Sequence, residues 1–184
     1  MGKTYDLNIE WEGGTYTSST RIPELIPLDS VWFKREGNPE LGFIWAHLTE
    51  PDTAGNAYRW WAQRINVNSE GQPKDAAFVP PLGSAFDDRF INGKSFDFVY
   101  GRGPSAPDDP PEEGGFFKLG DTIVVKFSTC DQGVFQFLRT FEAEAGNNGN
   151  PFASPSPIRS NMEGGALGIW AGYGSVLDTV YAVD

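Results

Sequence analysis

Residues 120–174 constrain the fold most strongly, because strand, helix and turn signals follow one another there without interruption. Ile123, Val125 and Phe127 alternate with more polar neighbours, a pattern that predicts a half-buried strand. The apolar spacing then changes to that of a helix, which we predict over residues 131–145. A strand followed directly by a short helix therefore forms the centre of the predicted fold.

The second half of this segment predicts an extended crossing and a return strand. Three prolines in residues 150–157 remove backbone donors and hold the chain extended, which excludes a helix. Glycines recur in residues 166–173, which we predict to be a strand that returns beside the helix. A final strand is predicted over residues 175–183.

The N-terminal residues predict a hairpin and a linker. Residues 5–11 alternate strictly between apolar and polar side chains, and residues 15–20 return after a turn at Gly13 and Gly14. Two prolines then make residues 22–27 a semi-rigid linker.

The rest of the chain predicts an all-β domain. Strand-like runs lie between turn signals at residues 29–34, 41–48, 58–67 and 95–100. The predicted fold is a mainly β structure, an antiparallel β-sandwich with one short α-helix. We assign residues 1–30 to a hairpin and linker, interpreted as the remnant of a preceding β-domain, and residues 31–184 to the sandwich domain.

Composition excludes several classes of function. The 184-residue chain has a net charge of −11, which argues against a nucleic-acid partner because phosphates require Lys and Arg. The single cysteine, Cys130, cannot form an intramolecular disulfide, and we interpret it as a packed side chain in preference to a reactive one. No apolar run is long enough for a transmembrane helix.

Three aromatic residues are candidates for ligand binding. Trp60 and Trp61 are adjacent in a predicted strand, so their side chains must point to opposite sides of the sheet. One of them can present a flat ring to a sugar or a cation, while burial of both is the structural alternative. Tyr100, at the end of another predicted strand, is the third candidate.

The evidence for a metal site or a catalytic site is weak. Asp87 and Asp88 are weak candidates for calcium ligands, with a turn cap or a solvated pair as the alternative. The only histidine, His47, cannot form a metal site by itself, and we expect a structural or surface role. No nucleophile motif or metal-binding motif is present, so we predict neither a cofactor nor an enzyme, although a carboxylate-based glycan hydrolase stays open as a minor alternative.

The C-terminal segment resembles a known family signature. The order of a "GNPF" segment, a proline and then "SNMEGGALGIW" is similar to the signature of domain of unknown function 4249, a family of outer-membrane-associated lipoproteins from Bacteroidota. The residues at matching positions are Asn150, Pro151, Phe152, Pro155, Asn161, Gly164, Gly165, Gly168, Ile169 and Trp170. Segments 16–33 and 86–98 also resemble the family, so the resemblance extends over most of the chain.

The resemblance implies a setting but no activity. Family members are periplasmic or surface-exposed lipoproteins, often encoded near a TonB-dependent outer-membrane transporter. The resemblance therefore implies an outer-membrane-anchored cell-envelope domain, attached to the membrane only through a lipid anchor outside this sequence. We expect this domain to bind a nutrient, such as a glycan or a peptide, or to dock on such a transporter. A structural or assembly module without a small ligand is the alternative. An aromatic-lined pocket would favour the first hypothesis, and a broad flat patch would favour docking.

Overall fold

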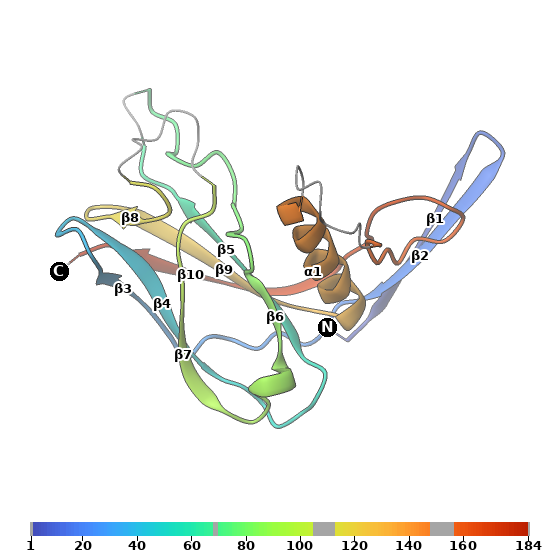
Figure 1. The fold of residues 1–184 in the computed structure, drawn as a ribbon, viewed down its shortest axis with the longest axis horizontal. Coiled ribbons are helices and arrows are strands. Elements are labelled where there is room, and N and C mark those ends of the chain that lie inside the picture. The colour runs from blue at the N-terminus through green and yellow to red at the C-terminus, as the bar shows by residue number, and fades with distance from the viewer. Residues whose placement is uncertain (1, 68–69, 105–112, 148–156, 184) are drawn as a thin grey trace.

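The computed structural model describes residues 2–67, 70–104, 113–147 and 157–183. The fold is mainly antiparallel β, with three sheets and one α-helix, so the predicted fold class is confirmed (Figure 1). In chain order the elements are β1 (Thr4–Trp11), β2 (Gly14–Arg21), β3 (Ser30–Arg35), β4 (Leu41–Thr49), β5 (Ala57–Arg64), β6 (Ala85–Asp87), the 3-10 helix η1 (Asp88–Phe90), β7 (Ser95–Tyr100), β8 (Phe117–Lys118), β9 (Thr122–Cys130), α1 (Gln132–Asn147) and β10 (Tyr173–Tyr181).

Two sheets pack face to face and enclose the main core. One sheet has the strand order β10-β9-β5-β6, and the other has the order β3-β4-β7 with β8 added to β4. Ile123, Val125 and Phe127 of β9 are fully buried between the sheets, as their alternation predicts. Tyr58 of β5 stacks on Phe127, with the ring centroids 5.3 Å apart. Burial of each such side chain contributes about 1.5–3 kcal/mol, so these strands determine which face of the sheet is internal.

The helix α1 begins directly after β9 and covers the outer face of the same sheet. The carboxylate of Asp131 accepts a hydrogen bond from the Val134 amide at 2.8 Å and thereby caps the first turn. Val134 and Phe135 are buried against Ala57 and Cys130. The prediction of a helix over residues 131–145 is therefore confirmed within two residues at either end.

The segment between the helix and β10 differs from the prediction. We predicted a strand over residues 166–173, but residues 157–172 contain no strand and β10 begins at Tyr173. Gly164, Gly165 and Gly168 have positive φ angles, which a regular strand does not accommodate. The prediction of a position beside the helix is correct, because the apolar side chains of this segment pack against the helix cluster: Ile169, Ala171 and Tyr173.

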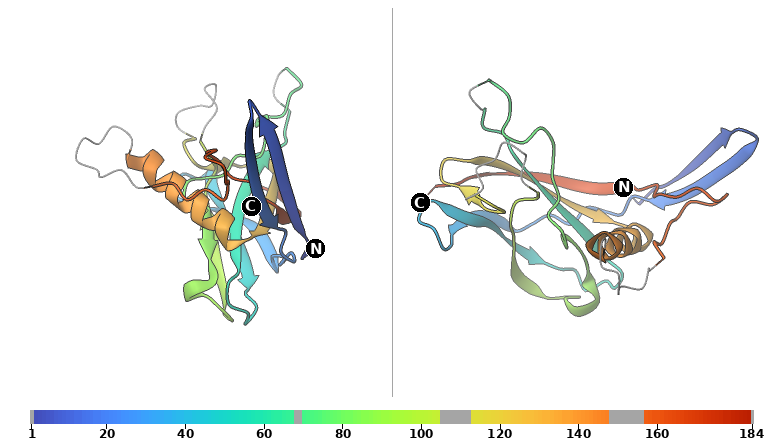
Figure 2. Two further views of the ribbon diagram at one scale, coloured as in Figure 1. Left: turned by 90° about the vertical axis from the view of Figure 1, so that its right-hand side faces the viewer. Right: turned by 45° about the horizontal axis from the view of Figure 1, so that its top comes forward.

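The N-terminal hairpin projects away from the sandwich (Figures 1 and 2). Its two-residue turn is formed by Glu12 and Gly13, which both have positive φ angles, while Gly14 pairs with Trp11. The predicted turn at Gly13 and Gly14 is thus displaced by one residue. Whether residues 1–30 are the remnant of a preceding domain stays a prediction.

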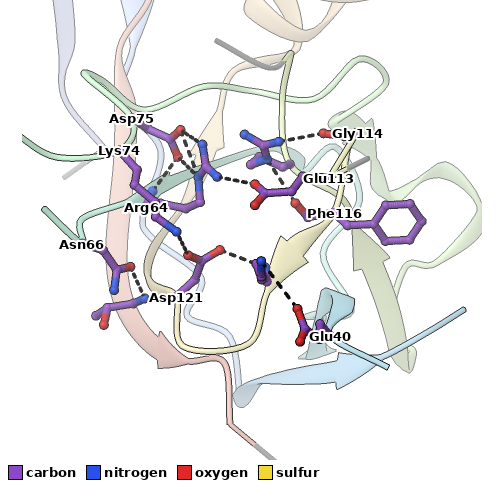
Figure 3. A network of polar contacts seen from close by, with 12 residues as sticks. Glu40, Arg64, Asn66, Lys74, Asp75, Glu113, Gly114, Phe116 and Asp121 are labelled. Atoms are coloured by element: carbon purple, nitrogen blue, oxygen red, sulfur yellow. Dashed lines mark hydrogen bonds and ion pairs between the residues drawn. The ribbon is translucent and has the colours of Figure 1, made fainter. Parts of the chain in front are cut away.

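A buried ionic network fixes one end of the sandwich (Figure 3). The guanidinium group of Arg64, which is 1% exposed, lies between the carboxylates of Asp75, at 2.8 Å, and Glu113, at 3.2 Å. Nearby, Lys74 pairs with Asp121 at 2.7 Å. These contacts connect β5 with the loops on both sides of β8. None of the described helices is of a length and apolarity that would span a membrane.

Candidate functional site

The two adjacent tryptophans point to opposite sides of β5, as predicted. Trp60 is fully buried between the sheets, where its ring packs at 5.6 Å from Tyr100 and edge-on to Phe98. Trp60 therefore has no face open to a ligand. Tyr100 is half-buried, its hydroxyl donates to the Gly83 carbonyl at 3.3 Å, and burial raises the pKa of its phenol. These two aromatic residues have a structural role in the core.

Trp61 lies on the outer face of the sheet, where side chains of neighbouring residues already contact its ring. The ammonium group of Lys126 lies 4.9 Å from the ring centroid, and the guanidinium carbon of Arg59 lies 5.8 Å from it. Tyr173 contacts Trp61 edge-on with a centroid distance of 5.2 Å. A sugar that stacked on Trp61 would compete with these cations, so the structure favours an internal role for this ring.

The predicted metal candidates are held by contacts within the chain. The Asp88 carboxylate is buried and accepts hydrogen bonds from the amides of Gly55, at 2.6 Å, and Asn56, at 2.8 Å. Asp87 pairs with Arg89 at 3.1 Å. Within the described ranges, no three His, Cys, Asp or Glu side chains converge on a point that would hold a metal ion. Asp88 thus organises a turn, which is the structural alternative for this pair.

His47 and Cys130 have structural surroundings. The Nδ1 atom of His47, on the outer face of β4, lies 2.6 Å from the Asp97 carboxylate on the neighbouring strand β7. Cys130 is buried under α1, and burial followed by the charge of Asp131 raises the pKa of its thiol to about 12. The thiol is therefore protonated at neutral pH and is not poised for nucleophilic attack.

The described signature residues form a clamp on the hairpin, an arrangement that local sequence patterns did not indicate. The side chain of Asn161 donates to the Trp170 carbonyl at 2.8 Å and accepts from the Trp170 amide at 2.9 Å. The loop thus closed lies along β2, where the Glu163 amide donates to the Thr17 carbonyl at 2.8 Å. The signature residues Asn150, Pro151, Phe152 and Pro155 lie outside the described residues.

The clamp, which we define as residues 161–172, also holds the base of the hairpin. The Thr20 hydroxyl donates to the Asp131 carboxylate at 2.9 Å and accepts from the Gly172 amide at 3.2 Å. The indole N–H of Trp170 donates to the Tyr5 carbonyl at 3.2 Å. Contacts from the sandwich, the helix cap and the clamp therefore converge on both strands and fix the direction in which the hairpin projects.

One face of the projecting hairpin is an exposed apolar surface. The side chains at alternate positions of β1 share this face, which we call the hairpin face: Tyr5, Leu7, Ile9 and Trp11. Trp11 is 65% exposed, Tyr5 46% and Ile9 43%. The sequence contained the signal for this surface, the strict alternation of residues 5–11, but alternation alone predicts burial. In the structure the clamp buries the cross-strand partners Ser18 and Thr20 on the β2 half of this face, whereas the β1 side chains remain partly exposed.

Comparison with known proteins places the chain in a family. Searches of curated proteins and of solved structures gave no significant match. A model of the family described as domain of unknown function (DUF4249) matches residues 1–176, a range that includes the hairpin, the sandwich strands up to β10 and the clamp. The resemblance seen in the sequence is therefore confirmed. The chain belongs to the DUF4249 family of domains of unknown function.

Proposed function

We propose that this chain is a non-enzymatic cell-envelope lipoprotein domain that docks on a TonB-dependent outer-membrane transporter through the hairpin face. The observation that carries the proposal is the exposed row of Tyr5, Ile9 and Trp11 on a hairpin that the clamp holds in a fixed direction. The envelope setting and the class of partner come from the family signature in residues 150–170.

The energetics of a hairpin favour a covering partner. A two-stranded hairpin is marginally stable in water unless its apolar face packs against something else. Here the clamp holds β2 at Thr17 and Thr20, whereas its hydrogen bond to β1 comes from the indole of Trp170 at the base of the hairpin. Tryptophan and tyrosine are also the side chains that contribute most to protein interfaces, because they bury large areas at low entropic cost. Trp11, near the tip of the hairpin, is therefore the expected anchor.

The backbone of β1 offers a second means of attachment. In the described part of the chain β1 pairs with β2 alone, whereas β2 also receives the Glu163 amide on its other side. The outer edge of β1 therefore presents a row of backbone donors and acceptors to which an extended segment of a partner can add. An open edge beside an apolar face fits a protein partner better than a small molecule.

Co-purification from envelope extracts of the source organism tests the proposal. The bait is the full lipidated protein, either unchanged or with the double substitution Ile9→Ser and Trp11→Ser. The matched control is Phe141→Ser, because Phe141 is 48% exposed and lies on α1, in neither the hairpin nor the clamp. We expect a transporter to co-purify with the unchanged bait and the control, and to be lost with the hairpin variant. Equal recovery with all three, or none with any, would overturn docking and favour an assembly module without this partner.

A further inference from the structure

We infer that the groove between η1 and α1 is a binding site for a small amphipathic carboxylate. The groove has a volume of about 510 Å³ and is lined by residues of β6 and η1 and by residues of α1. This volume lies within the range of roughly 300–1,000 Å³ that small-molecule sites occupy. The lining of the groove includes no residue of the hairpin face and none of the aromatic candidates Trp60, Trp61 and Tyr100.

The apolar lining comes from both walls. Phe135 and Ala143 lie two turns apart on one side of α1, and Phe90 lies opposite them on η1. Phe135 is 4% exposed and forms part of the helix cluster, whereas Phe90 is 79% exposed. Phe90 therefore presents most of its ring to solvent at the rim of the groove. A ligand with an apolar body would cover Phe90 and fill the groove.

The charges around the groove select an anion. The carboxylate of the groove residue Glu142 already has partners within the chain: it accepts hydrogen bonds from the Arg59 guanidinium group, at 2.6 Å, and from the Gly83 amide, at 2.9 Å. The other carboxylate of the groove, Asp87, pairs with Arg89 at 3.1 Å. Arg139, which also lines the groove, forms no ion pair with any described residue.

The lining of the groove is neutral, with two guanidinium groups, those of Arg89 and Arg139, and two carboxylates, while the chain as a whole has a net charge of −11. Both carboxylates are already paired, Asp87 with Arg89 and Glu142 with Arg59, so the charge of Arg139 is left for a ligand. A guanidinium group recognises a carboxylate with two parallel hydrogen bonds and retains its charge at all physiological pH values. Arg139 is the group available for this contact, and Phe90 and Phe135 accept the apolar body.

The test is a titration of the isotope-labelled protein with phenylbutyrate, followed by amide chemical shifts. Phenylbutyramide, which has the same shape without the charge, is the matched ligand control. We expect shifts confined to residues 83–90 and 135–143, at least about tenfold weaker binding by Arg139→Ala, and partial retention by Arg139→Lys. Phe90→Ser should also weaken binding, because it removes the aromatic wall.

Two control variants keep the outcome interpretable. Arg35→Ala removes an exposed arginine from β3, and Phe141→Ala removes an exposed phenylalanine from α1 outside the groove. Both should bind as the unchanged protein does. The inference is wrong if no shifts occur, if they occur elsewhere, if the amide binds equally well or if Arg139→Ala has no effect. The Ile9→Ser and Trp11→Ser variant should bind normally, so failure of docking and failure of this site are distinguishable.

Discussion

Gly164 lies directly against the backbone of Thr15, at the point where the clamp crosses the hairpin. A Cβ atom at position 164 would overlap the Thr15 carbonyl oxygen, and φ at this residue is +83°. The next residue, Gly165, has nearly the same φ of +85°, yet a Cβ there would meet no atom within 4 Å. Two adjacent glycines of the signature thus have different reasons to be glycine, since only Gly164 is required by the approach of the hairpin.

This difference predicts unequal effects of two alanine substitutions. Gly165→Ala introduces only the left-handed backbone strain of about 1–2 kcal/mol. Gly164→Ala introduces the same strain and also displaces the clamp from β2, so amide hydrogen exchange should accelerate throughout β1 and β2 in this variant alone. Hydrogen exchange by mass spectrometry measures both variants. Equal protection of the hairpin in the two variants would show that the clamp does not hold it.

The buried ionic network predicts a large loss of stability on removal of its cation. Arg64→Leu leaves the buried carboxylates of Asp75 and Glu113 without their cation, which costs about 3–5 kcal/mol in such sites. Arg35→Leu, at an exposed position on β3, is the control and should change the free energy of unfolding by less than about 0.5 kcal/mol. Urea unfolding of the two variants makes the comparison. A similar midpoint for both would contradict the assignment of Arg64 as a structural cation.

Two desolvated groups, the buried thiol of Cys130 and the partly buried phenol of Tyr173, predict a loss of stability at alkaline pH. Burial raises the pKa of Cys130 from 9.0 to about 12 and that of Tyr173 from 10.0 to about 12. Because the folded state retains these protons and the unfolded state releases them, the stabilisation is complete below the unfolded pKa values and decreases as the pH rises toward 12.

Unfolding free energies measured at increasing pH test this relationship. Cys130→Ala removes one of the two groups, so its free energy of unfolding should decline less steeply above pH 9 than that of the unchanged protein. The thiol should also react with alkylating reagents only after unfolding, because it is buried and protonated. Rapid alkylation of the folded protein at neutral pH would show that the thiol is accessible.

Patterns in the sequence correctly predicted the strands and the helix whose formation depends on residues close together in the chain. The alternation of Ile123, Val125 and Phe127 indicated β9, and the helical spacing of the apolar residues after it indicated α1. Residues 166–173 were predicted wrongly because their backbone is organised by a side chain. The side-chain amide of Asn161 forms the hydrogen bonds to the backbone N–H and carbonyl of Trp170 that a neighbouring strand would otherwise form.

The surfaces we propose could not be derived from the sequence, since each depends on contacts distant in the chain. The clamp meets the hairpin through Glu163 and Thr17, which are 146 residues apart. The groove brings Arg139 of the helix opposite Phe90 of η1, and neither residue belongs to a motif. The two candidate tryptophans show another limit of the sequence. Because Trp60 and Trp61 are adjacent in a strand, their rings must point to opposite faces, but the sequence does not say which of the two rings is buried.

Site-specific photo-crosslinking in the source organism tests the central claim most directly. A photoreactive phenylalanine analogue replaces Trp11 on the hairpin face or, as the control, Phe141 on α1, and adducts are identified after irradiation of intact cells. The account predicts an adduct with an outer-membrane transporter from position 11 and none from position 141. No transporter adduct from position 11, or the same adducts from both positions, would contradict docking through the hairpin face.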